Sequence, residues 1–174
     1  MGLDMYLSRK VYVWGDHRKS LKITGLKSKI RPEKVNYIIE RAGYWCKANA
    51  IHNWFVENVQ GGNDDCKPYY VSKEDIQKLL NTVNEVLRAS ELVDGEINNG
   101  YTFNDKGEKV FFKEKGKVIK DPSVAEALLP TIEGFFFGDT DYDQYYYDEL
   151  VSTKKVLEEA LTFDEDDFEY QASW

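Results

Sequence analysis

Residues 44–56, YWCKANAIHNWFV, constrain the fold more than any other stretch of the chain. Two tryptophans, a histidine, a lysine and two asparagines lie there within about four helical turns. At 3.6 residues per turn, His52 shares one face with large apolar side chains, and Lys47 and Trp54 share an adjacent face. The pattern predicts an amphipathic helix from about residue 44 to the glycine pair at 61–62, with polar groups at the edge of its buried stripe.

Alternating apolar and polar residues predict β-strands at both ends of the chain. Near the N-terminus the apolar positions are Leu3, Met5 and Leu7. Near the C-terminus they are Phe168, Tyr170, Ala172 and Trp174, so we expect the last residue to be buried in the fold. Further extended runs lie at 11–14 and 69–71. The glycine-bracketed aromatic residues 134–138 predict a short buried strand that lets another backbone or a ligand come close.

Helix-start signals occur at three other places. Ser72 and Asp75 form a capping pattern ahead of apolar residues at helical spacing, which predicts a helix that ends near Ala89. A similar capping pattern predicts that another helix begins at residues 140–143. Proline is tolerated in a first helical turn, so we expect a short helix at residues 32–39.

These elements predict a single-domain α+β fold, with a mainly antiparallel sheet and about three helices packed on one face. The N-terminal, phenylalanine-rich and C-terminal strands are expected to form the sheet. A chain of 174 residues is long enough to bury a core without disulfides. Residues 93–121 are rich in glycine, asparagine and lysine, which predicts a charged hairpin or a mobile excursion.

The net charge of −8 is unevenly distributed along the chain. Residues 139–169 contain 12 acidic residues and two lysines, whereas the rest of the chain carries +2. This balance disfavours nucleic-acid binding through a basic face. No apolar run reaches the roughly 18 residues that span a bilayer, and the two cysteines are far apart. We therefore expect no membrane partner, no disulfide framework and a cytoplasmic location.

The chain lacks the short motifs of the common enzyme classes. It contains no P-loop, no GxSxG elbow, no HExxH and no CxxC. Cys46 and His52 are six residues apart, which places them on different sides of a helix. We therefore expect no metal site and no bound cofactor.

The candidate binding residues form two groups, and the first lies in the predicted central helix. Lys47, Asn49 and Asn53 are costly to bury, and asparagine competes with helical hydrogen bonds, so we expect their side chains to face a ligand. His52 and Trp54 belong to the same group. The alternative for His52 is a buried histidine whose hydrogen bonds are satisfied within the core.

The second group lies in residues 135–147, where seven of thirteen residues are aromatic. Part of this segment is expected to be core, but consecutive tyrosines on a helix point in different directions and cannot all be buried. The candidates to line a site are Phe136, Tyr142, Tyr145 and Tyr146. Aromatic planes beside amides, a lysine and hydroxyls suit a planar, polar ligand such as a nucleotide.

Several blocks of the chain resemble a family of small proteins encoded by bacteriophages and prophages. The blocks are MGLDMYL at residues 1–7, GYWCKANAIHNWFV at 43–56, DDC at 64–66 with YYVS at 69–72, LLPT at 128–131, GFFFG at 134–138 and the closing Ser173-Trp174. They span nearly the whole chain in the family's order. Members typically carry arginine where this chain has Cys46. The resemblance implies a phage protein that acts in the cytoplasm of its bacterial host, and it implies no particular chemistry.

Three functions are compatible with these residues, and each allows a homo-oligomer. The first is a phage-encoded, non-enzymatic binding protein that sequesters a small nucleotide-like ligand, such as a host immune signal, and so counters host defence. The second is an inhibitor that binds a host defence protein through the acidic and aromatic surface of residues 139–169. The third is a small hydrolase or transferase that uses His52 or Lys47, for which no second catalytic partner is evident in the sequence.

Overall fold

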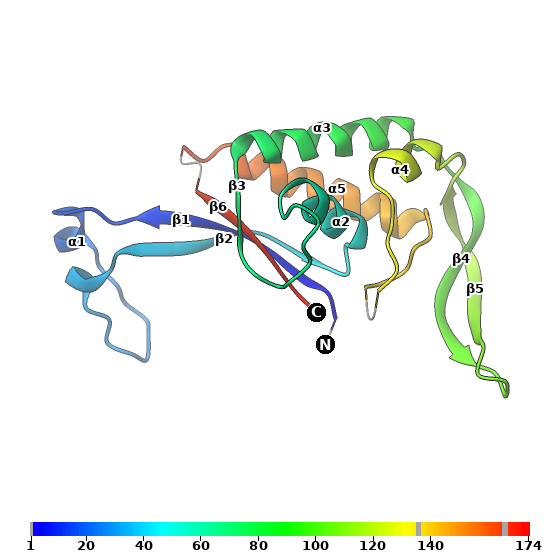
Figure 1. Cartoon of the computed structure of the whole chain (residues 1–174), viewed down its shortest axis with the longest axis horizontal. Coiled ribbons are helices and arrows are strands. Elements are labelled where there is room, and N and C mark those ends of the chain that lie inside the picture. The colour runs from blue at the N-terminus through cyan, green and yellow to red at the C-terminus, as the bar shows by residue number, and fades with distance from the viewer. Residues whose placement is uncertain (1, 135–136, 165–166) are drawn as a thin grey trace.

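The computed structural model describes residues 2–134, 137–164 and 167–174, which form an α+β fold around an antiparallel sheet (Figure 1). The strands of this sheet are β1 (Asp4–Tyr12), β2 (Tyr37–Cys46), β3 (Tyr69–Val71) and β6 (Phe168–Ser173). Their order is β2-β1-β6-β3, and every neighbouring pair is antiparallel. The predicted fold class is confirmed, and β6 confirms the C-terminal strand.

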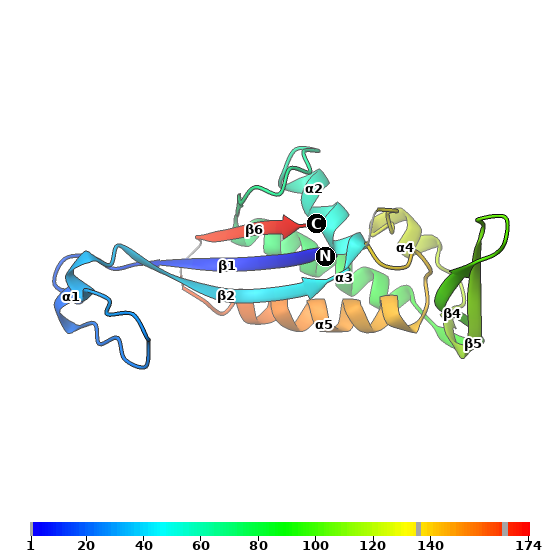
Figure 2. The ribbon, with the colours of Figure 1, turned by 90° about the horizontal axis from the view of Figure 1, so that it is seen from below.

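Three helices cover one face of the sheet (Figure 2): α2 (Asn49–Asn58), α3 (Lys73–Ala89) and α5 (Gln144–Ala160). The strand residues on that face are buried, and their sequence neighbours are more exposed. In β1 and β6 these buried residues are Met5, Leu7, Phe168, Tyr170 and Ala172. The Tyr170 ring stacks on Phe55 of α2 with 3.9 Å between ring centroids. Burial of these side chains supplies most of the driving force for folding.

The predicted burial of Trp174 is wrong, because its side chain is 52% exposed. The strand ends at Ser173, so Trp174 lies beyond the paired register of β6. Its indole Nε1 donates to Asp64 Oδ1 at 3.0 Å. The last residue therefore contacts the fold through a surface hydrogen bond.

The start of α2 also differs from the prediction. Tyr44 and Trp45 belong to β2, where they pair with Tyr6 and Met5 of β1, and helical structure begins only at Asn49. The inward position of Trp45 in the sheet explains its burial, which the sequence pattern attributed to a helix face. Between strand and helix, Lys47 has a φ of 62°, a left-handed conformation that turns the chain. The predicted end of the helix is confirmed by positive φ angles at both glycines, 61 and 62.

The capping signals predicted one helix start correctly and placed another three residues early. At α3, Ser72 Oγ accepts from the Asp75 backbone N–H at 3.1 Å, and the Asp75 carboxylate accepts from the Ser72 N–H at 3.3 Å. At α5, the cap is Asp143 instead of Thr140. Residues 140–142 lie outside the helix because their carbonyls bind elsewhere: Thr140 O accepts from the Thr131 hydroxyl, and Tyr142 O accepts from the Ile119 N–H.

Two β-hairpins project from the body at opposite ends (Figures 1 and 2). One consists of β4 (Leu92–Phe103) and β5 (Lys109–Ile119), and it confirms the hairpin alternative predicted for residues 93–121. The short helix α4 (Ser123–Leu128) follows this hairpin. The other consists of the outer parts of β1 and β2, with α1 (His17–Ser20) and the 3₁₀ turn η1 (Pro32–Lys34) between them. The helix predicted at 32–39 is confirmed only for its first turn, the 3₁₀ turn that begins at Pro32, and its extension is wrong because residues 37–39 pair with β1 as strand. Of the extended run predicted at 11–14, residues 11–12 are the end of β1, and residues 13–14 lie beyond the strand.

The phenylalanine-rich strand is also wrong for the residues that are described. Gly134, Phe137 and Gly138 lie in irregular backbone outside both sheets, and residues 135–136 lie outside the described part of the chain. Phe137 is nevertheless buried, in contact with the core. Among the described helices, none combines the length and the apolar character that crossing a membrane requires.

We expect the outer part of the β4–β5 hairpin to be dispensable for folding. Ile97 is the outermost buried residue of β4, and beyond it Asn98 pairs directly with Lys113. Replacing residues 99–112 with an Asn-Gly turn should therefore change the melting temperature by no more than about 3 °C.

Deleting residues 168–174 should instead abolish cooperative unfolding, because β6 is the strand between β1 and β3. Circular dichroism melts measure both; a shortened hairpin that fails to fold would contradict this division.

Candidate functional site

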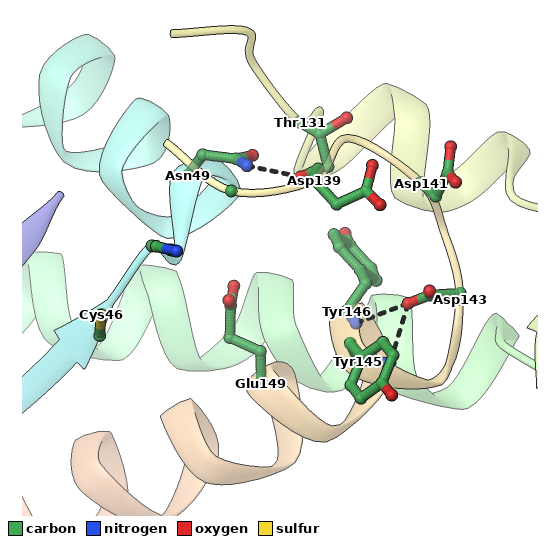
Figure 3. Close-up of a pocket in the computed structure, with 11 residues that line it drawn as sticks. Cys46, Asn49, Thr131, Asp139, Asp141, Asp143, Tyr145, Tyr146 and Glu149 are labelled. Atoms are coloured by element: carbon green, nitrogen blue, oxygen red, sulfur yellow. Dashed lines mark hydrogen bonds between the residues drawn. The ribbon is translucent and has the colours of Figure 1, made fainter. Parts of the chain in front are cut away.

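A cavity of about 190 Å³ lies where the end of β2, the start of α2, the loop after α4 and the first turns of α5 meet (Figure 3). Four of its eleven lining residues are acidic, and one is basic. The lining residues are Cys46, Lys47, Asn49, Thr131, Gly138, Asp139, Asp141, Asp143, Tyr145, Tyr146 and Glu149. Four of the nine predicted binding residues are thus brought together here: Lys47, Asn49, Tyr145 and Tyr146.

Asn49 connects the start of α2 to the loop that forms the opposite wall of the cavity. Its side chain is buried, and Nδ2 donates to the carbonyl oxygens of Phe137, at 3.1 Å, and Asp139, at 2.7 Å. Its Oδ1 accepts from the Ile132 N–H at 3.1 Å. The side chain therefore satisfies three backbone groups of one irregular loop. Its role is to build the cavity wall, whereas the sequence predicted that its amide faces a ligand.

The backbones of Lys47 and Gly138 approach each other closely where the two walls meet. A Cβ atom on Gly138 would lie 3.0 Å from the Lys47 carbonyl oxygen, and Gly138 has a φ of +98°. Only glycine meets both demands without strain. The prediction that a glycine in this block lets another backbone come close is therefore confirmed for Gly138. The Lys47 side chain is exposed, and it is the basic residue among those that line the cavity.

Four carboxylates surround the cavity, and three of them have raised pKa values. Burial raises the pKa of Glu149, on the second turn of α5, to about 8. Burial also raises the pKa of Asp143, and it does so although that carboxylate accepts hydrogen bonds from two backbone N–H groups. For Asp141, burial and then the neighbouring charge of Asp139 act in the same direction. The site therefore favours protons, N–H donors or positive charge.

The tyrosines of the predicted group divide between the core and the cavity. Tyr146 is buried, and its hydroxyl donates to the Leu129 carbonyl at 2.9 Å. Burial raises its pKa above the ordinary value. Tyr142 packs edge-on against Tyr146 and accepts from the Thr131 N–H at 3.2 Å, so it holds the loop. Tyr145 is 55% exposed, and its ring is the one that a bound molecule can reach.

His52 lies outside the cavity, in a buried hydrogen-bonded chain. Its side chain has no exposed surface. Nδ1 lies 2.8 Å from the Tyr170 hydroxyl, and Nε2 lies 3.0 Å from Asp64 Oδ2. Because a carboxylate only accepts, Nε2 carries the proton and donates to Asp64, and Nδ1 of the neutral ring accepts from Tyr170. The second interpretation of His52, a core histidine with satisfied hydrogen bonds, describes this arrangement.

The remaining predicted residues are not part of the cavity lining. Trp54 is buried in the core, edge-on to Phe55. Asn53 is half-buried on α2 and does not line the cavity. Phe136 lies outside the described residues. The first group of candidates is therefore divided: Asn49 lines the cavity, whereas His52 and Trp54, about one helical turn further along α2, are buried in the core.

The sequence did not single out Glu149, Thr131 or the three aspartates as binding residues. A helical signal could have found Glu149, because it follows Tyr145 and Tyr146 by four and three residues and so shares their side of α5. No local signal could have found Thr131. It reaches the cavity only because the loop after α4 folds back onto α2.

Within the described ranges, no three histidine, cysteine, aspartate or glutamate side chains are grouped so that they could hold a metal ion. The carboxylates line different walls of the cavity, as Figure 3 shows. In comparisons with known proteins, no family model, no curated protein and no solved structure matches this chain. The properties of the site therefore have to be derived from its own geometry.

The structural role of Asn49 predicts a large difference between two asparagines one helical turn apart. Asn49→Ala should lower the free energy of unfolding by about 2–3 kcal/mol, because it leaves the Ile132 N–H and two carbonyls without their partner. Asn53→Ala should change it by no more than about 0.5 kcal/mol. Urea denaturation measures both. Equal stability of the two variants would show that the loop is not held by Asn49.

The raised pKa of Glu149 predicts a pH-dependent stability. Its folded pKa of about 8 lies above the ordinary value of 4.5, so the folded chain holds a proton that the unfolded chain has lost between these pH values. The stabilisation is complete below pH 4.5 and is lost as the pH rises through about 8. Glu149→Gln should remove a fall of about 3 kcal/mol in the free energy of unfolding between pH 5 and pH 9.

The matched control for this experiment is Glu159→Gln, which changes an exposed glutamate of the same helix. Its unfolding free energy should follow that of the unchanged protein across the whole pH range. If Glu149→Gln also follows the unchanged protein, the carboxyl is ionised in the fold at neutral pH and the cavity is more hydrated than its geometry indicates.

Proposed function

We propose that this protein is a non-enzymatic binding protein, and that its cavity recognises the N–H donor edge of a nucleobase in a nucleotide-like ligand. The observation that carries the proposal is the set of four carboxylates around one small cavity, with the exposed ring of Tyr145 beside them. Carboxylates accept hydrogen bonds from the amino groups of bases, and aromatic rings stack on base planes.

The size of the cavity limits how much of a ligand it can enclose. Sites for drug-sized ligands usually have volumes of about 300–1,000 Å³, whereas this cavity has about 190 Å³. It suits a single ring system or an amino group. The sugar and phosphates of a nucleotide would lie outside, at the mouth of the cavity.

The charge of the cavity determines which end of the ligand enters. Asp139, Asp141 and Asp143 repel phosphate, so a nucleotide is expected to enter with its base first. Lys47, at the edge of β2, is the lining residue that suits a phosphate outside the cavity. A carboxylate that is partly desolvated favours an N–H donor strongly, because the hydrogen bond is charge-assisted.

Two features support binding without turnover. His52, the one histidine of the central segment, is fully buried and bonded on both sides, so a substrate has no access to it. Lys47 is exposed, and no hydrogen bond or ion pair joins its amino group to another described side chain, so no base is positioned to activate it. Neither of the two residues that the sequence suggested for catalysis is therefore placed to act on a ligand in the cavity.

The resemblance to phage-encoded proteins supplies the biological setting of the proposal. A protein of this kind would act in the cytoplasm of the host bacterium and would sequester a nucleotide-like immune signal. Sequestration needs affinity and abundance, and it needs no catalytic group. The acidic cavity is consistent with that mode of action.

Inhibition of a host protein is a second candidate, favoured by an open groove of about 610 Å³ between α3 and α5. Apolar parts of Leu87, Tyr147 and Val151 lie in it, with Arg88 and Glu158 among the polar residues at its sides. Apolar surface with a polar rim is the composition of protein interfaces. This surface is separate from the cavity, so changes in one should not affect the other.

Calorimetry with nucleosides tests the first proposal. Cytidine, guanosine and adenosine should bind at least as tightly as their triphosphates, because phosphate adds repulsion and the cavity does not enclose it. Glu149→Gln should weaken binding about tenfold or more at pH 9, because it replaces a charged acceptor. In the unchanged protein, affinity should rise as the pH increases through about 8, since N–H donors favour the ionised carboxylate.

The control variant is Asp148→Asn, which removes an exposed charge of α5 outside the cavity lining. It should bind as the unchanged protein does. Triphosphates that bind where nucleosides do not would refute base-first recognition, and products seen by chromatography after incubation would refute a purely binding role.

A further inference from the structure

The outer hairpin of β1 and β2, residues 8–41, has a composition unlike that of the rest of the molecule. It contains ten lysines and arginines and three acidic residues, although the whole chain carries −8. We call this segment the basic arm. Beyond Arg9, β6 no longer pairs with β1, so the outer part of the arm is a two-stranded ribbon that extends away from the helices (Figures 1 and 2).

Most of the charge on the basic arm is not neutralised by the protein itself. Three cations near its base or turn have acidic partners: Arg9 with Glu40, Lys10 with Glu169 and Lys19 with Asp16. Five other cations are exposed and form no ion pair with any described residue: Lys22, Lys27, Lys29, Arg31 and Lys34. A group of free cations on a projecting ribbon attracts a polyanion.

Aromatic rings lie on the same ribbon as these cations. Trp14 is 71% exposed, and its ring centroid lies 5.9 Å from that of Tyr12. Tyr12 pairs across the ribbon with Tyr37, with ring centroids 6.2 Å apart. The Lys10 ammonium lies 5.6 Å from the centre of the Tyr37 ring. Three neighbouring exposed rings, with the Lys10 ammonium beside one of them, form a surface on which flat groups can stack.

The acidic cavity lies at the other end of the molecule. The carboxylates of the cavity are at the N-terminal end of α5 and in the loop before it, whereas the arm projects beyond the C-terminal end of α5 (Figure 1). The net charge of −8, from which we expected no nucleic-acid binding through a basic face, therefore hides a basic segment, because the rest of the chain carries −15. The arm itself carries +7.

We propose that the basic arm binds single-stranded nucleic acid, with the backbone phosphates on the free cations and bases stacked on Trp14, Tyr12 and Tyr37. A phosphate backbone supplies the regular negative charge that the cations match. Unpaired bases supply the flat faces that the three rings match, and a duplex keeps those faces covered. An acidic peptide would match the charge and leave the rings exposed. DNA and RNA share this chemistry.

Fluorescence anisotropy of labelled 20-nucleotide strands, dT₂₀ and U₂₀, tests the proposal with the full chain. We expect salt-dependent binding at 50 mM salt, tighter than to a duplex of equal length, with quenching of tryptophan fluorescence. Trp14→Ala should weaken binding about 5-fold or more, the usual effect of losing one stacked ring. The ratio of dT₂₀ to U₂₀ affinity distinguishes DNA from RNA as the preferred strand.

The charge test combines Lys22→Gln, Lys27→Gln and Lys29→Gln. This triple variant should reduce the slope of log affinity against log salt concentration by about 2, as expected for three lost phosphate contacts to a single strand. Its matched control removes three exposed lysines elsewhere: Lys106→Gln, Lys115→Gln and Lys155→Gln. The aromatic control is Phe103→Ala, an exposed ring of the other hairpin. Both controls should bind as the unchanged protein does.

Several results would overturn the proposal. One is the absence of any anisotropy change up to about 100 µM protein at low salt. Another is binding to a duplex that is as tight as binding to a single strand and that Trp14→Ala does not weaken. A third is a loss of affinity in the control variants equal to that in the test variants. Binding to anionic lipid vesicles in place of strands would assign the arm to a membrane surface. Salt-sensitive self-association without strand binding, measured by sedimentation, would assign it to the acidic face of a second copy.

Discussion

The side chain of Asn49 holds together parts of the chain that are 83 to 90 residues apart. Its three hydrogen bonds go to the Ile132 N–H and to the carbonyl oxygens of Phe137 and Asp139, which have no partners in a sheet. These backbone groups are therefore satisfied although they lie outside regular secondary structure. The close approach at Gly138 follows from the same constraint. The cavity exists because this loop is held against the start of α2 while α5 begins only at Gln144.

Polar residues that looked suited to chemistry serve the core, and residues without a clear signal form the site. Asn49 and His52 are buried and fully bonded, which is how a core accommodates polar groups. Glu149 and the aspartates of the loop carry the unusual electrostatics, because burial raises the pKa of Glu149, Asp141 and Asp143, and the charges of neighbouring aspartates add to this for the two aspartates. Polar character in the sequence was therefore a poor guide to accessibility, which depends on packing.

The separation of charge between the two ends of the molecule gives the proposed functions different locations. An acidic cavity at one end and a basic, aromatic arm at the other do not compete for the same ligand. A small ligand in the cavity and a nucleic-acid strand on the arm can in principle be bound together. Because the α3–α5 face lies between them, any coupling would have to pass through the helical layer.

The sequence by itself determined the elements whose signals are local. Period-two alternation predicted β1 and β6, capping and helical spacing predicted α3, and the glycine pair predicted the end of α2. The tertiary structure decided what depends on distant partners. Pairing with β1 made Trp45 a strand residue, and Asn49 binds the carbonyl of Phe137, which lies outside both sheets. It also decided which charges share a cavity, since burial and proximity arise only when segments far apart in the chain are packed together.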